Sequence, residues 1–126
     1  MRTDRQRVQI VADALANLSS RFRDEYELQD NVARALRAAG LAFDRERAFS
    51  TGRVDFAVTV NSAIVVVEVK VDGDVAGVTR QLLRYLSHEE VVGVVLVSSR
   101  AVHSAALVSD INGKPVRVVR PTAGAL

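Results

Sequence analysis

The sequence predicts an α/β domain in which helices cover a mixed β-sheet. Apolar residues recur every three or four positions over residues 4–39 and again over 75–87, a spacing typical of amphipathic helices. Elsewhere, short runs rich in Val and Ile are bounded by Gly, Asn, Ser and Asp, as strands usually are. The predicted order is α-α-β-β-β-α-β-α-β, which suits one sheet with helices packed on it.

The first predicted helix spans residues 4–22 and carries one apolar stripe. The stripe can pack on the sheet or on a second copy of the chain, so a homodimer is one interpretation. The stripe consists of the apolar residues at helical spacing, Val8, Val11, Leu15, Leu18 and Phe22.

A second helix is expected over residues 24–39, because Asp24 can cap its start and Gly40 can end it. The segment after it, "LAFDRERAF" over residues 41–49, alternates imperfectly and is typical of an edge strand. In the helix over residues 24–39, the predicted buried stripe consists of Leu28, Val32, Leu36 and Ala39.

The next two strands, "RVDFAVTV" and "AIVVVEVKV", form a hairpin with Asn61 and Ser62 in its turn. A helix over residues 75–87 follows, and then "VVGVVLVSS", a continuous apolar run typical of a strand buried on both faces. A short helical turn over 100–108 and a last strand, "PVRVVR", complete the prediction. His88 and His103 are isolated in the sequence and are expected on the surface.

Charged residues interrupt this apolar hairpin. If the turn is centred between its two polar residues, Asp55 lies directly opposite Glu68, and Arg53 lies opposite Lys70. Asp55, Glu68 and Lys70 then share one face, while the face that includes Val54 is uniformly apolar. Opposed carboxylates repel, so a cation is expected between or beside them, either Lys70 or a divalent metal such as Mg²⁺. The alternative is a plain Asp55–Lys70 ion pair, with Glu68 reaching solvent.

The hairpin resembles the motif of the PD-(D/E)XK nuclease superfamily. Asp55 stands in "GRVDFAV", and Glu68-Val69-Lys70 stands in "VVVEVKV" on the next strand. The usual Pro before the Asp is absent, and Val54 occupies its place. The resemblance covers residues 24–98 and implies a restriction-endonuclease-like α-β-β-β-α-β core, preceded here by an extra N-terminal helix. It also implies Mg²⁺-dependent hydrolysis of phosphodiester bonds, with DNA as the favoured substrate, RNA as an alternative, and Mn²⁺ able to replace Mg²⁺.

The resemblance further implies a role for each motif residue. Asp55, Glu68 and the carbonyl of Val69 would hold the metal, and Lys70 would stabilise negative charge or orient the attacking water. Members of the superfamily often add an acid from the first core helix, and we expect Glu27 to serve here.

Glu25 is the alternative helix ligand, because it lies three residues before Leu28 and can also point inward. Both glutamates can equally be first-turn acids favoured by the helix dipole.

The helix after the hairpin carries polar residues that resemble the Gln-x-x-x-Tyr motif of RecB-type nucleases. These are Gln81 and Tyr85 in "QLLRYL", four residues apart and therefore on one helix face. Gln81 could orient Lys70, a water or a phosphate, and Tyr85 could stack on a sugar or base or hydrogen-bond a phosphate. Arg80 and Arg84 run beside them, and we assign both pairs, with Arg53, to substrate binding, the arginines on the phosphate backbone. A solvated helix face is the alternative.

Composition limits the other function classes. The 126 residues suit one domain, with an N-terminal segment over 1–22 and a core over 24–120. The chain has no cysteine, no apolar run of membrane-spanning length and no signal-like N-terminus, so we expect a cytoplasmic protein without membrane contacts. Walker-loop, dinucleotide, serine-elbow and zinc motifs are absent. The alternatives to a nuclease are a non-catalytic nucleic-acid-binding domain and an assembly module with the same fold.

Overall fold

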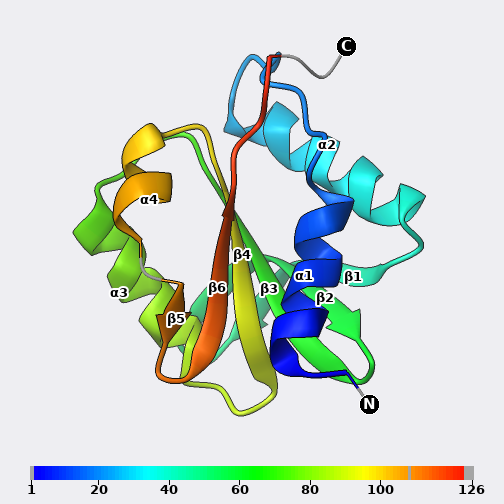
Figure 1. The fold of residues 1–126 in the computed structure, drawn as a ribbon, viewed down its shortest axis with the longest axis vertical. Coiled ribbons are helices and arrows are strands. Elements are labelled where there is room, and N and C mark those ends of the chain that lie inside the picture. Colours follow the sequence, from blue (N-terminus) through cyan, green and yellow to red (C-terminus); the bar gives the residue numbers. More distant parts are fainter. Residues whose placement is uncertain (1, 108, 124–126) are drawn as a thin grey trace.

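The protein is a mixed six-stranded sheet with two helices on each face, as the computed structural model of residues 2–107 and 109–123 shows (Figure 1). The strands lie in the order β1-β2-β3-β4-β6-β5. Their bounds are β1 Ala42–Phe49, β2 Gly52–Val60, β3 Ala63–Lys70, β4 Val91–Ser98, β5 Asp110–Ile111 and β6 Lys114–Val119. The helices are α1 Asp4–Ala14, α2 Glu25–Ala38, α3 Val75–Leu86 and α4 Ala101–Ala106.

The sheet combines both kinds of pairing, which confirms the predicted mixed α/β class. Neighbours β1, β2 and β3 pair antiparallel, whereas β3, β4 and β6 pair parallel. The strand predicted at an edge, β1, is at an edge. The short strand β5 was not expected, because two residues are too few to show an alternating pattern.

One face of the sheet is covered by α1 and α2, and the other by α3 and α4 (Figure 1). The stripe of α1 packs on its own sheet: Val8, Val11 and Leu15 have no exposed surface. Gly93 on β4 makes this close approach possible, because a Cβ there would meet Val8 and would lie 2.8 Å from the carbonyl oxygen of Pro115. The apolar face considered for a homodimer is therefore used inside the fold.

Helix α1 ends at Ala14, so the prediction of a helix over residues 4–22 is wrong in its second half. The chain instead pairs with the segment that follows β6. Thr122 donates its N–H to the carbonyl of Leu18, and Ser20 donates its N–H to the carbonyl of Thr122. Leu15 and Leu18 stay buried without being helical, because apolar burial fixes the side chains and long-range hydrogen bonds fix the backbone.

Helix α2 begins and ends close to the predicted bounds. Asp24 caps its start by accepting a hydrogen bond from the N–H of Glu27 (2.9 Å). Its end is a Schellman motif, in which Gly40 has a φ of 74° and the N–H of Leu41 donates to the carbonyl of Leu36 (3.0 Å). Ala39 follows the last helical residue and is exposed, so its predicted place on the buried stripe is wrong.

The hairpin turn between β2 and β3 has the predicted residues. Asn61 and Ser62 have φ values of 49° and 68°, as a two-residue type I′ turn requires. This turn sets the register, and the register decides which residues of the two strands face each other.

No helix among the described residues is long and apolar enough to cross a membrane.

Candidate active site

Strands β2 and β3 separate at Asp55, where side chains replace the backbone ladder. The pairing follows the predicted register, and its last pair at this end is Phe56 with Val67. Beyond it, the N–H of Asp55 donates to Glu68 Oε1 (2.8 Å), and the N–H of Val69 donates to Asp55 Oδ2 (2.8 Å). Each carboxylate thus binds the backbone of the opposite strand, and the two acids face each other across the fork.

The backbone of β2 turns at this fork, so the predicted face of Val54 is wrong. Strict alternation places Val54 with Phe56, but Val54 is buried under α3, whereas Phe56 is buried under α1 and α2. Separation from β3 frees the backbone from the ladder that enforces alternation. Strand β1 is irregular at the same level, where Glu46 has a φ of 56° between the partners of Val54 and Phe56.

Burial raises the pKa of both acids in the fork. Glu68 is 2% exposed, and its burial, followed by the negative charge of Asp55, raises its pKa to about 8. Burial also raises the pKa of Asp55, although the hydrogen bond from Val69 and the charge of Lys70 lower it. The pair therefore holds a proton at neutral pH, which relieves the repulsion between two like charges in a region of low dielectric.

Lys70 ends β3 beside these acids but forms no ion pair among the described residues. Its charge still lowers the pKa of both acids. The alternative of a plain Asp55–Lys70 ion pair, with Glu68 in solvent, therefore does not describe the hairpin. The two side chains form no ion pair, and Glu68 does not reach solvent. Lys70 lines an open depression of about 310 Å³, together with Glu25, Asp72, Gly73, Asp74, Gly77, Val78 and Gln81.

The first turn of α2 contributes Glu25 to this depression rather than Glu27. The negative charge of Glu25 raises the pKa of both fork acids, so it lies close enough to act on them. Glu27 instead forms an ion pair with Arg23, whose Nε lies 2.6 Å from Glu27 Oε2. In the sequence, Glu25 lies three residues before Leu28, and this helical spacing is the signal that could have placed Glu25 at the edge of the buried stripe.

Gln81 and Tyr85 connect α3 to the fork. Gln81 Nε2 donates to Tyr85 Oη (2.9 Å) and, over a longer 3.4 Å, to Glu68 Oε2. The hydroxyl of Tyr85 donates to the carbonyl of Arg53 (2.9 Å). Tyr85 is 2% exposed and cannot stack on a substrate base, so the expected contact with a base or sugar is wrong. Its role in the structure is to hold β2 against α3.

The three arginines assigned to substrate binding are exposed. Arg80 and Arg84 project from α3, and Arg53 precedes the fork on β2. None of them forms an ion pair with a described carboxylate. Their charge is available to an anion, but nothing in the structure shows that they converge on one.

His103 is completely buried, so its predicted surface position is wrong. Its Nε2 lies 2.9 Å from the carbonyl oxygen of Gly73, and its Nδ1 lies 2.6 Å from Ser98 Oγ. Because a carbonyl only accepts hydrogen bonds, Nε2 carries the proton and the serine hydroxyl donates to Nδ1. His88 is half-buried and its Nε2 lies 2.7 Å from Thr51 Oγ1. Both histidines contact residues too distant in sequence for the sequence to indicate.

The described residues contain no group of three or more His, Cys, Asp or Glu side chains arranged to hold a metal ion. The predicted trio of Asp55, Glu68 and Glu27 is not assembled, and Glu25 is the acid that approaches the pair. A larger hollow of about 920 Å³ lies beside α1, but none of the fork residues lines it. The candidate site is therefore identified by its chemistry and not by its size.

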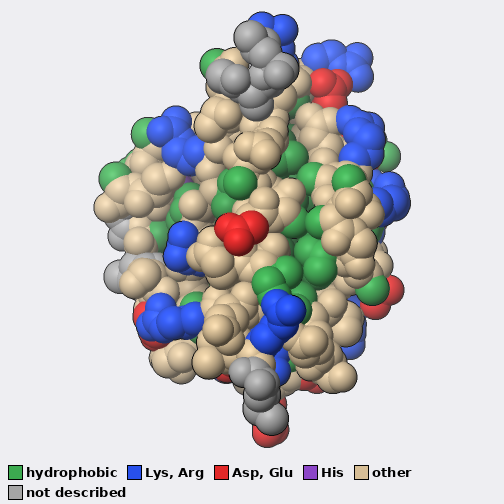
Figure 2. All heavy atoms as spheres, turned by 45° about the vertical axis from the view of Figure 1, so that its right-hand side comes forward, with side chains coloured by type: hydrophobic (Ala, Val, Ile, Leu, Met, Phe, Trp, Pro, Cys, Tyr) green, Lys and Arg blue, Asp and Glu red, His purple; other side chains and the backbone are tan. Residues whose placement is uncertain are grey.

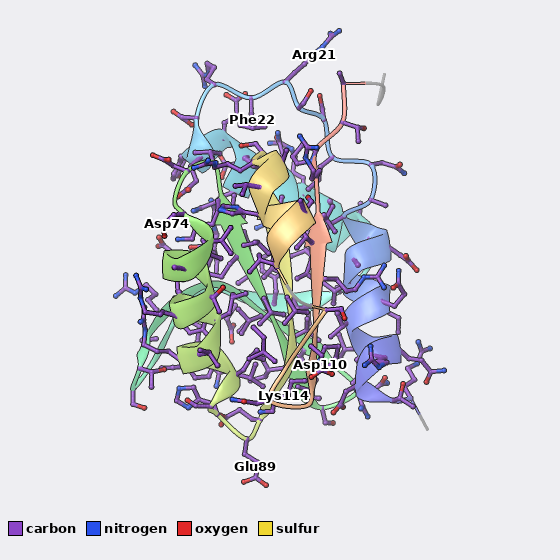
Figure 3. The ribbon with its side chains drawn as sticks, turned by 60° about the vertical axis from the view of Figure 1, so that its left-hand side comes forward. Arg21, Phe22, Asp74, Glu89, Asp110 and Lys114 are labelled. Carbon is purple, nitrogen blue, oxygen red and sulfur yellow. The ribbon has the colours of Figure 1, made fainter. Side chains whose placement is uncertain are left out.

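The depression beside the fork is lined by Asp74 at the start of α3. Figure 3 shows Asp74 on the half of the molecule where Phe22 lies, whereas Glu89 and Lys114 lie at the opposite end. Glu89 is exposed, in the turn between α3 and β4. No protein-family model matches the chain, and no curated protein matches it.

Proposed function

We propose that this chain is a metal-dependent nuclease that hydrolyses phosphodiester bonds, with DNA as the favoured substrate and RNA as an alternative. One observation carries the proposal. Half-buried Asp55 and buried Glu68 are held face to face where β2 and β3 separate, and Lys70 lies beside them without an ion pair to any described carboxylate. A core that needed only stability would gain nothing from opposed carboxylates, because their burial is costly.

The order of elements supports the same proposal. The segment from α2 to β4 runs α-β-β-β-α-β, the order expected of the restriction-endonuclease-like core. The motif acids lie on β2 and β3, at the end of the sheet where these strands separate. This agreement rests on the resemblance of the sequence motif and on the element order together.

The donor atoms suit a hard divalent cation. Asp55 and Glu68 each use one oxygen in the cross-strand hydrogen bonds, and Glu68 Oε2 has Gln81 Nε2 at 3.4 Å. Mg²⁺ needs only one or two protein carboxylates and keeps several waters, so a third acid is not required. A bound ion would supply an activated water and polarise the phosphate. Participation of the Val69 carbonyl and of Glu27 stays a prediction.

The side chains of the chain itself divide the remaining tasks. Lys70 would place a positive charge beside a phosphate in the depression and stabilise the charge that develops on it. Gln81 would hold Glu68 in orientation through its amide, and Tyr85 would keep the fork against α3. Arg53, Arg80 and Arg84 would bind phosphates away from the scissile bond.

A cleavage panel tests this function. Labelled single-stranded, duplex, flapped and four-way DNA, and a single-stranded RNA, are incubated with the pure protein in Mg²⁺ or Mn²⁺. We expect at least one substrate to be cut, and we expect EDTA to stop the reaction. The variants Glu68→Gln and Lys70→Ala should be inactive, whereas Glu89→Gln, a matched exposed acid at the far end of the molecule, should cut as the wild type does.

The same panel can reject the proposal. If no substrate is cut with either ion, and Glu68→Gln binds Mn²⁺ as tightly as the wild type does, the fork is not a metal-dependent catalytic site. Binding of nucleic acid without any cleavage would instead favour the non-catalytic binding domain. Activity that survives in Glu68→Gln at the wild-type level would also reject the fork as the catalytic site.

A further inference from the structure

Tyr26 is an unusually exposed aromatic side chain beside the candidate site. It is 68% exposed, whereas the other exposed large apolar side chains of the described residues, Leu83 and Val102, are each 39% exposed. It lies in the first turn of α2, directly after Glu25, which lines the depression with Lys70.

The ring of Tyr26 is supported from one side by a fixed cation. The guanidinium carbon of Arg45 lies 5.5 Å from the centroid of the Tyr26 ring. Arg45 is itself held by an ion pair with Asp30 (2.9 Å) and by the ring of Phe56, whose centroid is 5.5 Å from the same carbon. The aromatic ring is therefore ordered before any ligand arrives, which lowers the entropy lost on binding.

This supported ring is connected to the candidate site through Glu25, which directly precedes Tyr26 in the first turn of α2 and lines the depression with Lys70. Arg45 lies on the α1 and α2 side of the sheet, over the ring of Phe56. A ligand that extends from the depression past the start of α2 would meet the Tyr26 ring and the positive charge of Arg45, which suits a phosphate-bearing chain.

We propose that Tyr26 is a stacking platform for an unpaired nucleobase, so that the substrate has a single-stranded segment at the site. This inference rests on the proposed function, since it places the base next to the phosphate that the fork would attack. A duplex keeps its bases stacked within the helix, so it offers no free base to an exposed ring unless it is unpaired. Single strands offer a π-face at every nucleotide.

The distribution of charge makes such a platform useful. On the face shown in Figure 2, Lys and Arg side chains are scattered and do not form one large patch. Attraction of phosphates to dispersed charges is weak and sensitive to salt. A stacked base adds affinity that salt screens little, and it fixes which nucleotide lies at the fork.

Binding without cleavage tests the inference independently of catalysis. Fluorescence anisotropy in EDTA measures the affinity for labelled oligothymidylate, oligouridylate and a blunt-ended duplex of two annealed strands. Tyr26→Ala should weaken binding of both single strands about tenfold, the effect of losing one stacked base, and leave the duplex unchanged. Tyr26→Phe and Tyr26→Trp should bind as the wild type does. Val102→Ala is the control for removal of an exposed apolar side chain.

Each outcome decides the question. Equal single-strand affinity in Tyr26→Ala and wild type overturns the platform, and so does an equal loss for single strands and duplex. Loss in Tyr26→Phe as well would assign the effect to the hydroxyl and also overturn it. If single-strand binding depends on Tyr26 but nothing is cut, the platform stands and the nuclease proposal fails. If DNA is cut and Tyr26→Ala binds single strands as the wild type does, the nuclease proposal stands and the platform fails.

Discussion

Glu68→Gln should make the stability of the protein less dependent on pH. In the wild type the carboxyl group of Glu68 has a folded pKa of about 8, raised from 4.5 by burial and by the charge of Asp55. Between these two values the folded state binds a proton that the unfolded state releases, so the free energy of unfolding falls as pH rises. Glutamine keeps the size and the acceptor oxygen for the Asp55 N–H but has no proton to lose.

The size of the effect follows from the pKa. One pKa unit corresponds to about 1.4 kcal/mol, so a rise from 4.5 to about 8 represents a loss of at most about 5 kcal/mol on ionising Glu68 above pH 8. The full stability contribution of the protonated form is present below pH 4.5 and is lost as pH rises through about 8. The difference between Glu68→Gln and wild type should therefore be small at pH 4.5 and grow to a few kcal/mol at pH 9.

Urea unfolding followed by circular dichroism at several pH values measures this difference. Glu89→Gln serves as the matched control, because Glu89 is exposed and lies at the end of the molecule opposite to Phe22. The prediction concerns the difference between variants, which cancels the titration of groups distant from the fork, so the measured difference belongs to the Asp55–Glu68 pair. If the free energies of unfolding of Glu68→Gln and wild type differ by the same amount at pH 5 and pH 9, Glu68 is not a buried acid of raised pKa, and the reasoning on the fork is refuted.

Three further results are expected. Mn²⁺ binding at pH 7 should release protons from the fork, which calorimetry in two buffers of different ionisation enthalpy detects; buffer-independent heats would contradict this. Tyr85→Phe should lower the free energy of unfolding by about 1–2 kcal/mol, because Gln81 and the Arg53 carbonyl lose a buried partner. Gly93→Ala should lower it by about 1–3 kcal/mol, because a Cβ overlaps Val8, and an unchanged urea midpoint would place α1 elsewhere.

Elements with local signals were predictable from the sequence. Helix α2 has a capping Asp24 and a terminating Gly40, and the hairpin has Asn61 and Ser62, the residue types that its turn requires. The hairpin register follows from that turn, and with it the facing positions of the two acids. These features depend on a few neighbouring residues, which a sequence displays directly.

Features that depend on distant contacts were not predictable. The non-helical course of residues 18–20 after α1 is held by hydrogen bonds to Thr122, and buried His103 by a carbonyl thirty positions away at Gly73. The turn of β2 at Asp55 arises because the strands separate, which the alternating pattern of Val54 and its neighbours does not reveal. In each case the competing local pattern was present and a tertiary interaction outweighed it.

The place of α1 has a consequence for biosynthesis. Among the described elements α1 is translated before the others, yet it packs on β4 and β6, which are translated later. Its apolar side chains therefore lack these partners until β6 has been translated, and in this interval Val8 and Val11 are open to chaperones or to other nascent chains. A chain interrupted before β6 would leave them uncovered, whereas one interrupted after Thr122 would not.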